Sequence, residues 1–139
     1  MKKREKISSI MTKNVLTVDI DDSLKKVSDL FNAKKIRHLP VLSYGALVGM
    51  ISHTDMLRIS FGNTFGEDQI AADVAIFDML SINQVMKHSP VSVSADQTIT
   101  EAAEILSDRE FHALPVVQEK ELVGIITTKD LIKYYIYQN

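Results

Sequence analysis

Cysteine is absent from the 139 residues of the chain. Its absence excludes disulfides, thiolate zinc sites, iron–sulfur clusters and thiol nucleophiles, and it fits the reducing cytoplasm in which we expect the protein to reside. Charge of one sign is not in excess either, because 16 basic and 18 acidic residues leave a formal net charge of -2. A chain without a strong overall field has no general attraction for nucleic acid or an anionic membrane. We therefore expect neither as a partner.

Long hydrophobic runs are also lacking. Stretches such as Ala46 to Ile51 and Leu122 to Ile126 are too short to cross a bilayer and are typical of buried strands. The basic start at residues 1–4 is followed by polar residues and not by the apolar stretch of a signal peptide. With 45% apolar and 24% charged residues, the composition is that of an ordinary globular domain.

Motifs for catalysis and for metal binding are missing too. The four histidines show no i,i+4 pairing, and the sequence contains neither a Walker loop nor a Gly-x-Ser-x-Gly elbow. The paired carboxylates Asp21 and Asp22 are explained by the start of a helix. We therefore expect no enzyme, no metal site and no covalent cofactor.

The sequence repeats itself. A shift of 75 positions aligns the chain with itself without a gap, and the 48 pairs from Ile10/Val85 to Leu57/Ile132 include 11 identities. Two βα units of any α/β protein share some of this pattern. A true duplication is favoured because the alignment has no gap and because it matches a glycine with a glycine and a proline with a proline. The identical pairs include Leu39-Pro40-Val41 with Leu114-Pro115-Val116, Leu47-Val48-Gly49 with Leu122-Val123-Gly124, and Asp55 with Asp130.

Each repeat predicts the order strand, helix, strand, strand, helix. In the first repeat a β-branched segment at 15–18 precedes a helix start signal at 21–23, and apolar residues at helical spacing follow. A proline-containing strand over 39–42 and an apolar strand over 46–51 form a predicted hairpin, after which Ser52 opens the last helix. In the second repeat these features lie at 91–93, 96–98, 114–117, 122–126 and Thr127.

The predicted fold class is therefore α/β, or α+β in a finer division, with two βαββα repeats. We expect the first repeat at residues 7–61 and the second at residues 82–137. Residues 62–81 form the linker, with a loop by composition at 62–66 and a helix over 67–80.

Three pairs of motifs carry a family resemblance. They are Ile10-Met11 and Val85-Met86, then Ile36-Arg37-His38-Leu39-Pro40-Val41 and Phe111-His112-Ala113-Leu114-Pro115-Val116, then residues 49–55 and 124–130. With these motifs the chain resembles a tandem of cystathionine-β-synthase (CBS) domains, the Bateman module. The isolated pair with its long linker is similar to the acetoin-utilisation type of bacterial CBS protein. The resemblance implies that the two repeats pack sheet to sheet around a pseudo-twofold axis and that two modules form a homodimer.

The pairs Ser52-x-x-Asp55 and Thr127-x-x-Asp130 have two compatible interpretations. Each fits a helix capping box, in which hydroxyl and carboxylate satisfy backbone amides. Each also fits a nucleotide site, because a helix N-terminus attracts phosphate and a carboxylate accepts from ribose hydroxyls. In the relatives, the aspartate at this position holds ribose, and residues before Leu-Pro-Val of the opposite repeat wall the adenine or reach the phosphate.

The resemblance thus implies two ligand clefts. We expect Arg37, Lys129 and His38 to make the Asp130 cleft the stronger phosphate site, although such charges are often only solvated surface groups. One cleft combines Met50, Ser52, Thr54 and Asp55 with Phe111, His112 and Ala113. The other combines Ile125, Thr127, Lys129 and Asp130 with Asn14, Val15, Ile36, Arg37 and His38.

The function implied is a regulatory module. It binds an adenosine-containing ligand (AMP, ADP, ATP or S-adenosylmethionine) between its repeats and signals to an unidentified effector protein through a conformational change. One alternative is a constitutive dimerisation scaffold without a nucleotide, and another is a nucleotide hydrolase. The aromatic run at 133–137 continues the last helix as core or, if exposed, as a dimer contact.

Overall fold

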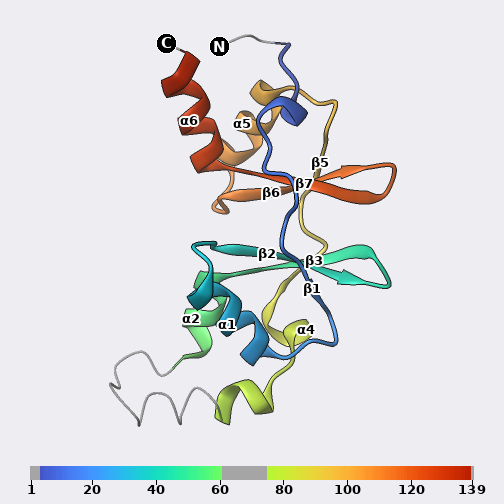
Figure 1. The fold of residues 1–139 in the computed structure, drawn as a ribbon, viewed down its shortest axis with the longest axis vertical. Coiled ribbons are helices and arrows are strands. Elements are labelled where there is room, and N and C mark those ends of the chain that lie inside the picture. Colours follow the sequence, from blue (N-terminus) through green and yellow to red (C-terminus); the bar gives the residue numbers. More distant parts are fainter. Residues whose placement is uncertain (1–3, 61–74, 139) are drawn as a thin grey trace. The chain divides into compact units, whose positions relative to one another are not determined.

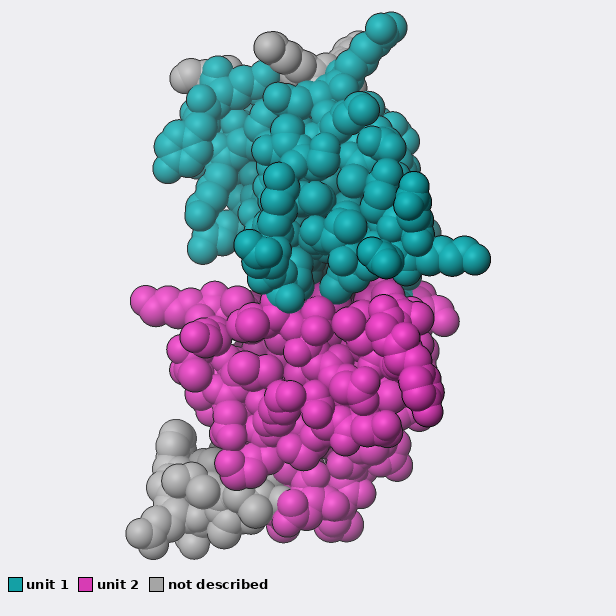
Figure 2. All heavy atoms as spheres, turned by 45° about the vertical axis from the view of Figure 1, so that its right-hand side comes forward, with its two compact units in different colours: residues 1–15, 90–139 teal, residues 16–89 magenta. Residues whose placement is uncertain are grey.

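The computed structural model describes residues 4–60 and 75–138, in two compact units (Figure 1). Unit 1 comprises residues 1–15 and 90–139, and unit 2 comprises residues 16–89, as the colours of Figure 2 show. Each unit contains one βαββα repeat with its own sheet, so the mixed fold predicted from the repeat is confirmed.

Unit 2 is built on a four-stranded sheet in the order β1-β2-β3-β4. Strand β1 pairs in parallel with β2, and β2–β3 and β3–β4 are antiparallel. The elements are β1 (Val18–Asp19), α1 (Leu24–Ala33), β2 (His38–Ser43), β3 (Ala46–Ser52), α2 (His53–Ile59), α4 (Ile82–Val85) and β4 (Lys87–His88).

Unit 1 repeats this plan on a three-stranded sheet in the order β5-β6-β7, with the same parallel and antiparallel pairings. Even the register shift after Val41 in β2 recurs after Val116 in β6. The elements are a 3-10 helix η1 (Ile7–Ser9), β5 (Val93–Ser94), α5 (Ile99–Asp108), β6 (Ala113–Gln118), β7 (Glu121–Thr127) and α6 (Thr128–Gln138).

Local sequence signals explain where the helices begin. The Ser23 hydroxyl accepts from the Lys26 amide at the start of α1, and Thr98 and Glu101 form a reciprocal capping box at the start of α5. The predicted linker helix is helical at 75–79, whereas its earlier part and the predicted loop at 62–66 lie outside the described residues. Within residues 4–60 and 75–138, no helix is long and apolar enough to cross a membrane.

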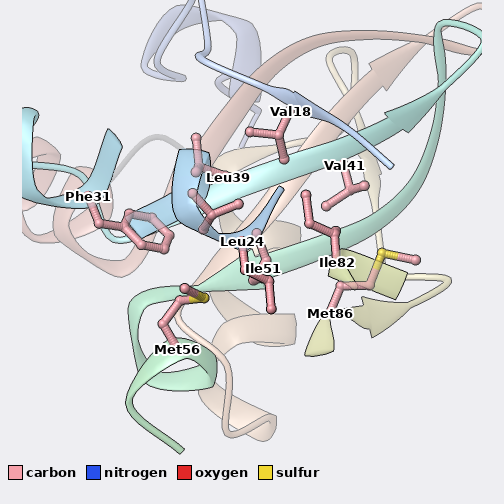
Figure 3. Packing of buried hydrophobic residues seen from close by; sticks show 10 residues of the cluster. Val18, Leu24, Phe31, Leu39, Val41, Ile51, Met56, Ile82 and Met86 are labelled. Atoms are coloured by element: carbon pink, nitrogen blue, oxygen red, sulfur yellow. The ribbon is translucent and has the colours of Figure 1, made fainter. Parts of the chain in front are cut away.

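Each unit has its own hydrophobic core. In unit 2 the apolar stripe of α1, formed by Leu24, Val27 and Phe31, packs with inward side chains of the sheet and with Ile82 of α4 (Figure 3). In unit 1, Ala102 and Leu106 of α5 pack in the same way with the sheet and with Ile7 of η1. The helical stripe predicted in each repeat is therefore the face that becomes buried.

The segment that leads into each repeat belongs to the core of the other one. The segment before β1 packs on the sheet of unit 1, where Thr12 and Ile125 exchange backbone hydrogen bonds of 2.8 and 3.0 Å. Residues 82–88, with which the second repeat begins, instead supply α4 and β4 to unit 2. The compact units therefore differ from the sequence repeats in these leading segments.

Candidate ligand-binding site

Asp55 in unit 2 lies at the start of α2 and completes a capping box. Its Oδ2 accepts from the Ser52 amide at 2.9 Å, and the Ser52 hydroxyl accepts from the Asp55 amide at 3.1 Å. Its Oδ1 lies 2.7 Å from the Arg58 guanidinium and 3.6 Å from the Lys87 ammonium. Asp55 is only 2% exposed. Both carboxylate oxygens are thus engaged within the unit.

Asp130 in unit 1 has the same backbone role in different surroundings. Its Oδ2 accepts from the Thr127 amide at 2.9 Å, and the Thr127 hydroxyl accepts from the Asp130 amide at 3.1 Å. In the described part of the chain Asp130 forms no ion pair. Its side chain is half-buried. The capping interpretation therefore holds in both repeats, but among the described residues Oδ1 of Asp130 has neither a hydrogen bond nor an ion pair, whereas Oδ1 of Asp55 has two cations beside it.

Asp130 borders an open hollow of about 450 Å³ between α6 and the N-terminal segment of unit 1. This volume lies within the range of small-molecule sites, roughly 300–1,000 Å³. Lys133 supplies a cation, and the hydroxyl of Tyr134 donates to the Glu5 carboxylate across the segment. The described residues that line the hollow are Glu5, Ile10, Asp130, Lys133, Tyr134, Tyr137 and Gln138.

Of the residues predicted for the Asp130 cleft, only Asp130 is among the described residues that line this hollow. Lys133 and Tyr137 lie three and seven residues after Asp130, a spacing that places all three on one face of α6. From this spacing the sequence could have indicated that Lys133 and Tyr137 lie beside Asp130. Glu5 carried no such signal, because it comes from a segment distant in the sequence and is placed there by the packing of η1.

The predicted residues of unit 2 lie around the hairpin of β2 and β3. His38 faces Ser52 across the two strands, and the Arg37 carbonyl accepts from the His53 amide at 2.8 Å. Arg37 is exposed and Thr54 is exposed, whereas Met50 is buried and Ile36 is half-buried. The His53 ring packs edge-on against Phe31, with centroids 5.8 Å apart, so it serves the packing of unit 2.

The predicted residues of unit 1 are arranged equivalently. Ala113 faces Thr127 across the hairpin of β6 and β7, and the His112 carbonyl accepts from the Thr128 amide at 2.9 Å. The other members differ in exposure. Ala113 and Ile125 are buried, Val15, Phe111 and Thr127 are half-buried, and Asn14, His112 and Lys129 are exposed.

Within each unit the structure thus brings a capping box next to the residues that precede Leu-Pro-Val of the same repeat. The two predicted clefts each draw residues from both units. In the described ranges, no three His, Asp or Glu side chains are grouped in a way that suits a metal ion.

Comparison with known families gives a repeated match: the model of the CBS domain matches residues 7–62 and residues 82–137. The chain is similar to protein MJ1225 of Methanocaldococcus jannaschii, with 30% identity over 132 residues, 94% of this chain and 47% of that protein. It therefore spans about half the length of this relative. The crystal structure of MJ1225 gives a TM-score of 0.81 at 29% identity, covering 97% of this chain and 49% of the other.

Two further solved structures match over almost their full length. One, described as the acetoin utilization protein AcuB of Vibrio cholerae, has a TM-score of 0.77 and 26% identity and covers 96% of this chain and 91% of its own. The other is CBSX2 of Arabidopsis thaliana in complex with AMP, with a TM-score of 0.79, 23% identity, and 96% and 98% coverage. At this last identity the likeness concerns the fold.

Proposed function

Because the chain belongs to the CBS domain family and carries the domain twice, we propose that it is a regulatory module that binds an adenosine-containing nucleotide between its repeats. The ligand class is AMP, ADP, ATP or S-adenosylmethionine. Binding shifts the balance between two poses of the repeats, or of two associated modules, and an effector protein responds. Such a shift is limited by the ligand's differential affinity for the poses, commonly about 1–3 kcal/mol.

The observation that carries this proposal is the environment of Asp130. A half-buried carboxylate with an oxygen outside any ion pair can accept from the two hydroxyls of a ribose. It stands in the first turn of an 11-residue helix, where free amides and the helix dipole favour a phosphate.

The remaining ligand contacts are proposed from the family resemblance. The Asp130 cleft combines the residues around β7 with Arg37 and His38, and the Asp55 cleft combines the residues around β3 with Phe111 and His112. Arg37 and Lys129 are exposed and form no ion pair among the described residues, so they remain available to phosphate. The AMP complex of CBSX2 supports this ligand class, because that protein has the same fold.

A thermal-shift screen tests the proposal. The ligands are AMP, ADP, ATP, S-adenosylmethionine and NAD, with guanosine monophosphate as the control for a non-adenine base. A ligand at one hundred times its dissociation constant raises the free energy of unfolding by about 2.7 kcal/mol. A rise in the unfolding temperature with an adenosine compound supports the proposal. If none of the compounds raises the unfolding temperature, the result supports the alternative, a scaffold that binds no nucleotide. In a separate assay, phosphate release from ATP would indicate a hydrolase.

We also propose that two copies of the chain associate through α6. This helix has no buried residue, and Ile132, Tyr135 and Ile136 on one face are 54%, 65% and 58% exposed. A second copy that covers this face would bury its apolar side chains, and this burial stabilises the dimer. Light scattering after size exclusion is expected to give a dimer mass, and Ile136→Lys is expected to give a monomer. A monomeric wild-type chain at high concentration would contradict this.

A further inference from the structure

The two capping aspartates occupy equivalent positions in the repeat but have different ionic partners. At Asp55 the partners are Arg58, three residues later in α2, and Lys87 from β4. A shift of 75 positions converts Arg58 into Lys133 and relates Lys87 to Thr12. Unit 1 therefore has a neutral residue where unit 2 places the second cation.

The backbone holds Lys87 at this position. Lys87 pairs with Met50 in the β3–β4 ladder, and the side chain of the preceding Met86 lies against Gly49 and is 5% exposed. The strand that carries Lys87 is thus fixed on the strand that ends at Ser52 of the capping box. Thr12 is fixed in the same way, through its backbone bonds to Ile125, but it brings no charge to Asp130.

The ion pairs at Asp55 oppose the binding of a sugar. A carboxylate binds a ribose by accepting from its hydroxyls, and at Asp55 both oxygens already accept, one of them from a guanidinium at 2.7 Å. The carboxylate is 2% exposed, although the side chains of Arg58 and Lys87 are 59% and 63% exposed. A neutral hydroxyl that displaces a cation from this oxygen still forms a charge-assisted bond, but the attraction between the two opposite charges is lost.

We infer that Lys87 and Arg58 act as an internal lock on Asp55, so that the chain presents one nucleotide acceptor, Asp130, and not two equivalent ones. This inference rests on the proposed function and adds the number of nucleotides bound per chain, which Arg58 and Lys87 determine. The lock combines a cation of the first repeat, Arg58 in α2, with one from the start of the second repeat, Lys87 in β4.

Calorimetric titration with AMP and ATP tests the inference, with Arg58→Lys/Lys87→Thr as the variant that gives unit 2 the residues of unit 1. The wild type is expected to bind one nucleotide per chain, and the double variant two. Adding Asp55→Asn to the double variant is expected to return it to one. Two sites of equal affinity in the wild type, or an unchanged single site in the double variant, would overturn the inference.

A ligand-free measurement separates this inference from the proposed function. If no adenosine compound binds the wild type, the proposed function fails, and the lock is then tested by a double-mutant cycle of Asp55→Asn and Lys87→Met in urea unfolding. The lock predicts a coupling of about two- to fivefold in the unfolding equilibrium constant. The matched cycle of Asp130→Asn and Thr12→Val is expected to show none. Additive effects at Asp55 and Lys87 would overturn the lock.

Discussion

The sulfur of Met86 lies directly against Gly49, so that a Cβ at position 49 would come within 2.3 Å of it. The pair Met11 and Gly124 repeats this relationship in unit 1, where the corresponding distance is 2.7 Å. In both units a methionine of the leading segment thus covers the glycine in the middle of the hairpin's second strand. These contacts attach the leading segment of each repeat to the opposite repeat's sheet.

The Gly49 contact predicts the effect of adding one methyl group. Gly49→Ala is expected to lower the free energy of unfolding by about 1–3 kcal/mol, because the buried Met86 side chain must move. The change is measured by urea unfolding. In a Met86→Ala background the same substitution is expected to cost less, since the sulfur is gone. Equal costs in the two backgrounds would contradict the packing described.

The hairpin turns predict a stabilising substitution. The first turn has Tyr44 and Gly45 at φ 49° and 81°, and the equivalent second turn has Glu119 and Lys120 at φ 50° and 71°. Only glycine adopts this region without a Cβ penalty. Lys120→Gly is therefore expected to raise the free energy of unfolding by roughly 0.5–1 kcal/mol. Gly45→Lys should lower it, and a loss of stability in both variants would refute the explanation.

Two threonines at the start of α5 predict effects of opposite sign. Thr98 caps the helix, so Thr98→Val is expected to lower the free energy of unfolding by about 1 kcal/mol. The hydroxyl of Thr100 is buried without a hydrogen-bond partner, so the equally sized Thr100→Val should leave stability unchanged or raise it. Thermal unfolding of the two variants measures the contrast. A larger loss at Thr100 than at Thr98 would be inconsistent with these roles.

The capping box of α5 also predicts a dependence on pH. Hydrogen bonds from the Gln97 side chain, then from the Thr98 backbone and hydroxyl, lower the pKa of Glu101. A carboxyl with a lowered folded pKa stabilises the fold above its unfolded value, near pH 4.3, and this contribution is lost as the pH falls through the folded value. Glu101→Gln is expected to flatten the acid limb of stability against pH. An identical acid limb in wild type and variant would contradict the assignment.

The element order of the fold could be predicted from the sequence because its signals are local. Helix caps such as Ser23 and Thr98, apolar stripes and proline-marked strands each act within a few residues of the element they specify. The exchange of leading segments could not be predicted in this way. It depends on packing between Met86 and Gly49, which lie far apart in the sequence. The alignment of the two repeats is also the same whether a leading segment packs on the sheet of its own repeat or on that of the other repeat.

The candidate site was predictable in part for the same reason. The capping boxes of Ser52 and Thr127 follow from a four-residue motif, and both are present in the structure. The difference between Asp55 and Asp130 was not visible in that motif. It arises from the ion pairs of Asp55 with Arg58 and Lys87, and only the tertiary fold places Lys87 of β4 beside Asp55.

Calorimetry of AMP binding to Asp130→Asn probes the proposed contact between Asp130 and the sugar of an adenosine nucleotide. Asparagine can still accept from the Thr127 amide at the start of α6, while the control Glu104→Gln removes the same charge from an exposed position of α5. At least about a tenfold loss of affinity is expected in Asp130→Asn, since charge-assisted hydrogen bonds contribute roughly 1.5–3 kcal/mol, and wild-type affinity is expected in the control. Equal AMP affinity in Asp130→Asn and the wild type would show that Asp130 does not bind the sugar.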